Sequence, residues 1–183
     1  MAPPRTLRDD MLELRPPTAL DVDELFAGVR ESLPEILPWM GWCHPDYARV
    51  DTAEWVRFTE QAWINETEHS FAIVERATGS VLGTCGLNGI DRANRWANLG
   101  YWVRTPATRR GVASRATTLV ADFGFTEVGL DRIEILAATG NTPSQRVAAR
   151  VGATREGVSR RRLRVRDTSH DAVVFSLIRD EWR

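Results

Sequence analysis

The chain has 183 residues, of which 43% are hydrophobic and 27% charged, and its formal net charge is −1. These values are typical of one globular domain, and they exclude a general electrostatic attraction to nucleic acid or to an anionic membrane surface. No apolar run approaches the ~20 residues of a membrane span, and no signal-peptide pattern opens the chain, so we expect a cytoplasmic protein. The two cysteines, Cys43 and Cys85, have neither metal-site nor disulfide-framework spacing, and we expect no metal.

The first third of the chain predicts a short strand followed by helices. Residues 1–10 are polar and carry two prolines, which favours an unpaired lead-in. Residues 11–15 alternate as in a strand, and apolar spacing over residues 18–37 predicts one helix or two, with Pro34 as a break or a first-turn residue. A capping-box pattern at residues 51–54 then predicts the start of another helix.

The remainder predicts a meander of strands with two further helices. Alternating apolar residues and turn signals indicate strands at residues 71–75, 80–87, 96–104, 132–138, 156–165 and 172–177. Apolar residues at 3.6-residue spacing predict a helix from Val112 to Phe123. Thr142 is expected to cap a second helix, with Pro143 in its first turn and Gln145 completing a capping box. We therefore expect one domain over residues 1–183, with a mixed α/β fold and a largely antiparallel sheet.

The turn between the strand at residues 96–104 and the following helix is the most informative stretch. Arg109, Arg110 and Gly111 stand just before the helix start, where the first N–H groups lack internal partners and carry the positive end of the helix dipole. Gly111 has no side chain, so a phosphate can approach the backbone closely. The pattern predicts a pyrophosphate site, although it has neither Walker spacing nor a dinucleotide fingerprint; an ordinary basic helix cap is the alternative.

The segment from Gly100 to Ala116 resembles motif A of the GNAT superfamily of acyl-CoA-dependent N-acetyltransferases, whose pattern is Gln/Arg-x-x-Gly-x-Gly/Ala. Gly111 and Ala113 match the last two positions of that pattern, and Thr108 stands at the first. The resemblance extends over nearly the whole chain. It implies a central twisted sheet, mostly antiparallel and splayed at its fourth strand, with about four flanking helices.

A second block is similar to the Rim-type acetyltransferases, a subgroup named for members that modify the N-termini of ribosomal proteins. This block runs from Arg132 through Asn141 and Ser144 to Gly157. In that subgroup the serine is a proposed proton donor to the departing thiolate, and the asparagine contacts the coenzyme arm. The resemblance therefore assigns these two roles to Ser144 and Asn141, and a first-turn serine with a purely local role is the alternative.

The resemblance also implies how coenzyme A is held. The splayed strand lends its free edge to the pantetheine arm, and a backbone N–H near Trp102 or Val103 faces the thioester oxygen. Gly100 inside this strand fits a bulge or a splay, and an edge-strand glycine without a ligand is the alternative. The residues expected to bind the coenzyme are Trp102, Val103, Arg104, Arg109, Arg110, Gly111, Val112, Ala113, Asn141 and Ser144.

A general base is harder to assign. Glu134 is a candidate because an acidic residue is unusual in the middle of a strand, and an ion pair with Arg132 or a neighbouring strand is the alternative. Related ribosomal enzymes have been assigned a glutamate base after the Glu-Gly pair, and spacing places Leu163 at that position here.

Aromatic and basic residues suggest how an acceptor is bound. Trp39 and Trp42 are expected on the amine side, where indoles can stack on a substrate or a cation, unless they pack a helix pair onto the sheet. Four arginines, which fall on one face of a predicted strand, could bind an acidic substrate segment, the coenzyme's ribose phosphate or a partner subunit, or form a solvated face: Arg160, Arg162, Arg164 and Arg166.

The sequence thus predicts an N-acetyltransferase that moves an acetyl group from acetyl-CoA to a primary amine, a protein N-terminus or a small molecule, by direct transfer in a ternary complex. The alternatives are another acyl donor such as succinyl-CoA and a non-catalytic coenzyme A-binding module. We expect no nucleic-acid or membrane partner, and the resemblance implies that a homodimer is a frequent state.

Overall fold

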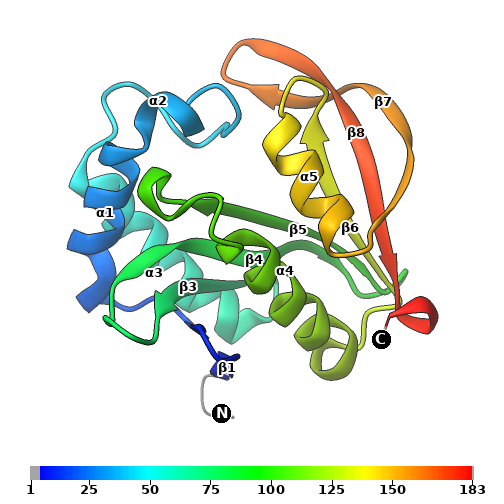
Figure 1. Ribbon diagram of the computed structural model, residues 1–183, viewed down its shortest axis with the longest axis horizontal. Coiled ribbons are helices and arrows are strands. Elements are labelled where there is room, and N and C mark those ends of the chain that lie inside the picture. Colours follow the sequence, from blue (N-terminus) through cyan, green and yellow to red (C-terminus); the bar gives the residue numbers. More distant parts are fainter. Residues whose placement is uncertain (1–4, 183) are drawn as a thin grey trace.

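The computed structural model describes residues 5–182, and its centre is one twisted sheet of eight strands (Figure 1). The strands are β1 (Leu7–Arg8), β2 (Leu12–Arg15), β3 (His69–Glu75), β4 (Val81–Asp91), β5 (Trp96–Val103), β6 (Arg132–Ala138), β7 (Thr154–Val165) and β8 (Thr168–Ile178). Their order across the sheet is β1-β2-β3-β4-β5-β6-β8-β7, and β5–β6 is the parallel pair in an otherwise antiparallel arrangement. The predicted mixed fold with a mostly antiparallel sheet is confirmed.

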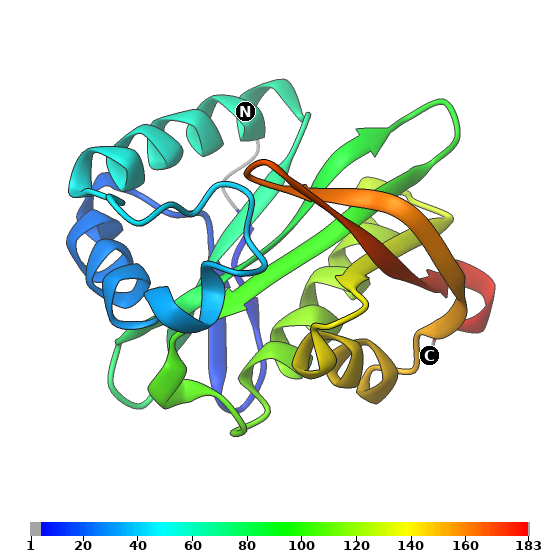
Figure 2. The same cartoon turned by 90° about the horizontal axis from the view of Figure 1, so that it is seen from above.

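Five α-helices flank the sheet in the described part of the chain, where about four were expected. They are α1 (Val22–Glu31), α2 (Leu33–Ile36), α3 (Arg49–Asn65), α4 (Val112–Phe123) and α5 (Thr142–Arg150). The alternation of side chains along the strands builds two cores, because Leu87 and Leu99 pack with α4, whereas Val74 and Trp102 pack with α1 and α3. Figure 2 shows α1 to α3 on one side of the sheet and α4 and α5 on the other.

The two central strands part from each other, as predicted for the fourth expected strand. β5 pairs with β6 only from Trp96 to Asn98, opposite Arg132 to Glu134. Beyond that point β5 remains paired with β4 as far as Val103, and β6 remains paired with β8. Of the bulge or splay expected at Gly100, the splay is observed: Gly100 lies opposite Gly86 in a regular register with β4, two residues past the last residue that pairs with β6.

The chain begins with more structure than expected. Leu7 and Arg8 pair with Leu14 and Glu13, so part of the expected unpaired lead-in is a strand; residues 1–4 lie outside the described residues. Pro34 does separate two helices, since it stands in the first turn of α2.

Two predicted helix caps are displaced, that of α3 by three residues and that of α5 by one. α3 begins at Arg49 because Asp51, expected as the cap, lies in its first turn and accepts the Ala48 N–H at 2.7 Å. α5 is capped by Asn141 rather than Thr142: its Oδ1 accepts the Ser144 N–H at 3.2 Å. At α5, Asn141 and Thr142 are both cap-forming residues, so local pattern alone cannot choose between them. At α3 the N-cap is Ala48, and the side chain that caps the helix start comes from the third helical residue, Asp51.

An aromatic cluster joins α3, β3 and α4. The His69 ring lies 4.4 Å from that of Trp63 and 5.3 Å from that of Phe123, centroid to centroid. Burial lowers the pKa of His69 to about 4, so the imidazole is neutral near pH 7 and packs as an apolar group. In the described residues no helix is both long and apolar enough to span a membrane.

Candidate active site

A row of free backbone amides opens α4. Within residues 5–182, none of the N–H groups from Arg109 to Ser114 has an acceptor on the protein. Gly111 is the N-cap, with a left-handed φ of 82°, and a Cβ placed there would meet no atom within 4 Å. A helix start with bare amides and open space in front of them fits a diphosphate.

The two arginines of this turn lie differently from each other. Arg110 forms an ion pair with Glu75 on β3, so its charge is already engaged by the protein. Arg109 has a left-handed φ of 60°, and no carboxylate in the described residues lies within ion-pairing distance of it. Any guanidinium contribution to anion binding at the start of α4 therefore falls on Arg109.

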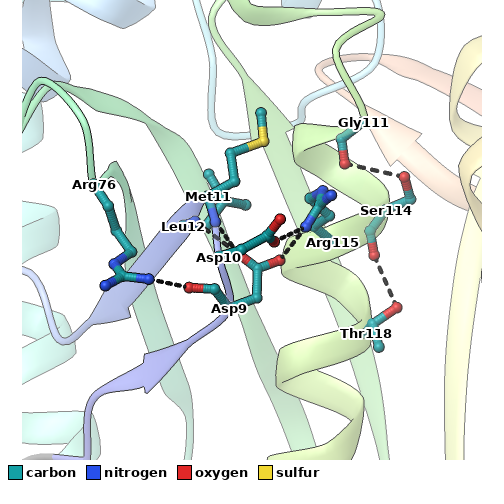
Figure 3. A network of polar contacts seen from close by, with 9 residues as sticks. All are labelled: Asp9, Asp10, Met11, Leu12, Arg76, Gly111, Ser114, Arg115 and Thr118. Carbon is teal, nitrogen blue, oxygen red and sulfur yellow. Dashed lines mark hydrogen bonds and ion pairs between the residues drawn. The ribbon is translucent and has the colours of Figure 1, made fainter.

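A polar network fixes the first turn of α4 against the start of the chain (Figure 3). Arg115 forms ion pairs with Asp9, at 2.9 Å, and with Asp10. Asp9 in turn accepts the N–H groups of Met11 and Leu12 at 2.8 and 2.7 Å. Burial would raise the pKa of the Asp9 carboxyl, but the Leu12 amide and the Arg115 guanidinium outweigh it and hold the pKa low. The helix start is thus clamped to the turn between β1 and β2.

The parted edge of β5 exposes alternate backbone amides. The Arg104 N–H donates to Leu82 O on β4 at 2.7 Å. Because backbone groups alternate in direction along a strand, the N–H groups of Tyr101 and Val103 point the other way, into the gap. Of the two amides expected near a thioester, that of Val103 faces the gap, whereas that of Trp102 faces β4. The gap therefore offers the backbone hydrogen bonds that an extended ligand arm needs.

Ser144 stands in the first turn of α5 and reaches across the gap to β5. Its Oγ lies 3.1 Å from the hydroxyl of Tyr101, which also donates to Ser144 O at 3.1 Å. Burial raises the pKa of Tyr101, so this hydroxyl stays protonated at neutral pH. No role for Tyr101 was predicted from the sequence. The strand alternation does place Tyr101 on the same face as Leu99 and Val103, which is the only sequence pattern that pointed to its position.

The other sequence-predicted coenzyme residues divide between backbone and side-chain roles. The Val112 side chain is buried in the core, so Val112 and its neighbour Ala113 contribute their amides to the helix start. Arg104 turns away toward α1, where its Nε donates to Glu31 at 2.8 Å. Asn141 uses its Oδ1 to cap α5, which leaves its side-chain NH₂ as the available donor.

A small aromatic pocket lies on the opposite face of the sheet from α4. The ring centroid of Trp42 lies 6.2 Å from that of Trp102 and 5.6 Å from that of Tyr47. These three residues help to line a cavity of about 160 Å³. His44 Nε2 and Asp51 Oδ2, 3.4 Å apart, supply polar groups at its wall. Trp39 is not part of this lining.

Trp39 lies instead against the turn that precedes α5. A Cβ placed on Gly140 would stand 3.2 Å from the indole Cη2 of Trp39, so the indole packs closely against the backbone of this turn. In the loop after α2, Trp42 contacts Trp102 on β5, whereas Trp39 contacts the turn at Gly140 that follows β6. Only Trp42 lines the pocket.

Glu134 is held by an ion-pair network. Arg132 contacts Glu134 at 2.7 Å and Glu156 at 2.6 Å, and Glu156 also accepts the Ser176 hydroxyl at 2.7 Å. The hydrogen bonds from Arg132 and Ser176 lower the pKa of Glu156 to about 2. The ion pair between Glu134 and Arg132 is the alternative to a general base that the sequence suggested. Glu134 and Glu156 both line an open groove of about 580 Å³ beside the point where β5 and β6 part.

The strand that carries the expected row of arginines is irregular in its middle, and Arg166 lies beyond its end. β7 and β8 change register between Ser159 and Leu163, because three residues of β7 there face one residue of β8. Arg161 has a left-handed φ of 52° at this irregularity. Because the irregularity adds two residues to β7, the alternation resumes in phase: Arg160, Arg162 and Arg164 are exposed, whereas Leu163 is half-buried and Val165 is buried. Arg166 lies beyond the end of β7, where it donates to Leu37 O at 2.8 Å.

With this geometry in place, comparison with known proteins is decisive for the family. Residues 11–154 match the sequence model described as acetyltransferase (GNAT) domain. The chain belongs to the GNAT acetyltransferase family. The resemblance seen in the sequence, including its Rim-type character, is confirmed.

Individual relatives agree with the family assignment. YdaF of Bacillus subtilis (strain 168), named as a candidate ribosomal N-acetyltransferase, is 36% identical over 104 residues. That match covers 57% of each chain, so this chain spans under two thirds of the length of the relative.

Solved GNAT structures match nearly the whole chain. A GCN5-related N-acetyltransferase from Brucella melitensis is 27% identical with a TM-score of 0.85, and the match covers 98% of this chain and 81% of that one. RimJ of Mycobacterium smegmatis, in complex with CoA-disulfide, is 25% identical with a TM-score of 0.86, over 97% and 88% of the two chains.

Proposed function

We propose that this GNAT protein transfers an acetyl group from acetyl-CoA to a primary amine, by direct transfer within a ternary complex. The observation that carries the proposal is the gap between β5 and β6, whose free edge amides lead to the bare amides that open α4. One surface can therefore bind an extended thioester arm and its diphosphate together.

The chemistry follows from the groups that face the gap. The acceptor nitrogen attacks the thioester carbon, a C–N bond forms and the C–S bond breaks. Edge amides of β5 are placed to polarise the carbonyl oxygen, and Val103 N–H is the candidate that the strand geometry favours. The departing thiolate takes a proton from the Ser144 hydroxyl, which regains one from solvent, and Ser144 Oγ lies 3.1 Å from the Tyr101 hydroxyl.

The acceptor's own proton needs a different route. Glu134 was the candidate base, but its carboxylate is already engaged by Arg132 in an ion pair at 2.7 Å. An amine of the N-terminal type, with a pKa of about 8, is partly deprotonated in neutral water and can lose its proton to solvent. We therefore propose that deprotonation depends mainly on the amine and on water.

The acceptor side supports two acceptor classes, a protein N-terminus and a small-molecule amine. The aromatic pocket at Trp42 and Trp102 is enclosed by α1, α3 and the sheet, whereas the groove at Glu134 and Glu156 is open. The open groove favours an acceptor that continues beyond its amine, which is a property of a polypeptide.

Two measurements test the proposal. Calorimetry should detect acetyl-CoA binding at micromolar concentration, and a thiol reagent should detect coenzyme A release only when a suitable amine is added. Binding without thiol release across a panel of peptides and small amines would indicate a non-catalytic module. Faster release from succinyl-CoA than from acetyl-CoA would change the donor but not the reaction class.

We also propose that residues 1–183 form a single acyltransferase domain, because one continuous sheet joins β1 to β7. A cytoplasmic location and a homodimeric state stay predictions from the sequence. Among the described residues, no group of three or more metal-ligating side chains is suited to a metal ion.

A further inference from the structure

We propose that the acceptor is a polypeptide N-terminus followed, about four residues later, by acidic residues that bind the arginines of the β7–β8 hairpin. This inference rests on the proposed acetyl transfer and names its acceptor class. It depends on the charge pattern along the open groove, which runs from Glu134 and Glu156 to Arg162.

The inner end of the groove favours a cation. Glu134 lies opposite Asn98 on the last rung that joins β6 to β5, so it marks the point where the gap begins. Its partner Arg132 is shared with Glu156, which leaves two carboxylates for one guanidinium. An ammonium group that arrives here meets a net negative charge of one, next to the place where the thioester must lie.

The outer end of the groove favours an anion. The segment from Thr154 to Asp171 contains six arginines and three acidic residues, although the whole chain has a net charge of −1. In the described residues no carboxylate lies within ion-pairing distance of Arg160, Arg161 or Arg162. These charges are exposed, and the protein itself leaves them uncompensated.

The hairpin is held in place over this side of the molecule. Arg166 donates to Leu37 O at 2.8 Å, and the Arg161 N–H donates to Asp171 Oδ1 at 2.8 Å. Figure 2 shows the tip of the hairpin beside the loop that follows α2. The arginines are therefore presented from a fixed strand pair, which lowers the entropic cost of binding a charged segment.

The register of the sheet gives the spacing between the two ends. Glu134 pairs with Ser176 and Ser159 pairs with Ala172, so four strand residues separate the inner rung from the start of the arginines. Four strand residues span about 14 Å, and an extended peptide covers the same distance with about four residues. A peptide with its amine at Glu134 thus places its fourth to sixth residues near Arg160 and Arg162.

A polypeptide fits this pattern better than RNA or a small amine. Nucleic acid would satisfy the arginines, but it carries no primary alkyl amine for the inner end. A small amine would satisfy the inner end but cannot reach the arginines. An acidic N-terminal segment satisfies both ends at once.

The test compares two peptides that share their first two residues and continue with four Glu or with four Gln. Steady-state kinetics on the wild-type protein should give a kcat/KM about tenfold higher for the Glu peptide, mainly through KM, and 0.5 M salt should remove most of this preference. The Arg160→Gln/Arg162→Gln variant should reduce the ratio to about twofold or less. The matched Arg8→Gln/Arg57→Gln variant, which removes two exposed arginines elsewhere, should keep it.

The outcomes separate the inference from the proposed function. Equal kcat/KM for the two peptides, or a Glu preference that survives in Arg160→Gln/Arg162→Gln, would overturn the acidic-segment inference and leave acetyl transfer intact. Acetylation of small amines but of neither peptide would overturn the polypeptide acceptor. Absence of transfer to every amine, despite bound acetyl-CoA, would overturn the proposed function itself.

Discussion

At the gap between β5 and β6, the two faces of the sheet, called its two sides below, offer different chemical groups to a ligand. The side that faces α4 and α5 offers backbone amides, from Tyr101 and Val103 on the strand edge and from Arg109 to Ser114 at the helix start. The side that faces α1 to α3 offers side chains, among them Trp42, Trp102 and Glu134. A backbone site suits a ligand that never changes, whereas a side-chain site can be altered by substitution without disturbing the fold.

The difference predicts opposite responses to mutation. On the coenzyme side, removal of a side chain should have little effect on the affinity for acetyl-CoA, which only added bulk or an altered first turn of α4 should lower. On the acceptor side, loss of a single side chain should change the apparent affinity for the amine. Each prediction below tests one part of this contrast.

The largest effect is expected from Gly111→Trp. A side chain there would project into open space in front of the free amides and block a diphosphate, so acetyl-CoA affinity should fall by more than about 100-fold. Gly79→Trp is a matched control, since Gly79 has a similar left-handed φ of 75° and equally open surroundings on a distant turn. Calorimetric affinity within threefold of wild type for Gly111→Trp would remove the backbone site from the coenzyme side.

Acid should loosen both sides together, because His69 joins α3 to α4. The unfolded chain takes up a proton below the ordinary histidine pKa of 6.5, whereas the folded chain does so only near pH 4. Stability therefore falls as the pH drops from 6.5 to 4, by up to about 3 kcal/mol from this group.

His69→Leu should flatten that part of the pH profile in urea unfolding. Fluorescence, dominated by tryptophans on the acceptor side, and far-UV circular dichroism should report one coincident transition. Two separate transitions would argue against a single domain.

Ser144→Ala should lower kcat by about 100-fold and leave acetyl-CoA affinity within about threefold. Tyr101→Phe removes the hydroxyl that holds Ser144 and should lower kcat less, by about tenfold. Single-turnover kinetics with calorimetry on both variants separate the two quantities. Parallel losses of turnover and binding in Ser144→Ala would reassign the serine to a structural role.

The smallest effect is expected from Trp42→Ala on the acceptor side. Loss of this half-exposed pocket wall should raise KM for the amine by about fivefold, with kcat and acetyl-CoA affinity nearly unchanged. Phe58→Ala, which truncates an exposed aromatic residue outside the pocket, is the control and should change none of them. If Trp42→Ala instead changed the affinity for acetyl-CoA and left KM for the amine unchanged, Trp42 would belong to the coenzyme side, and the division into two sides would be wrong.

The contrast also explains which parts of the site the sequence predicted. The bare helix start at Gly111 and the position of Ser144 in a first turn follow from rules that act within a few residues. The strand Arg132–Ala138 was predicted with the bounds that the structure shows. The parted strands came from the family resemblance, because nothing local to β5 specifies how far β6 accompanies it.

The unpredicted contacts join residues that are far apart in the chain. Tyr101 meets Ser144 over a separation of 43 residues, and Arg115 meets Asp9 over 106. Periodicity gives the face on which such a side chain lies but not its partner on another element. The irregular register of β7 was also not predicted, because the alternation of residues 160–165 does not reveal that β7 gains two residues against β8.

The central claim is that β5 binds acetyl-CoA through the amides that β6 leaves free. Amide hydrogen exchange, measured by NMR with and without saturating acetyl-CoA, tests it residue by residue. The amides of Tyr101 and Val103 should exchange at least about tenfold more slowly in the complex, while that of Trp102, which already faces β4, should change little. Unchanged exchange at Tyr101 and Val103, with acetyl-CoA bound, would contradict the account.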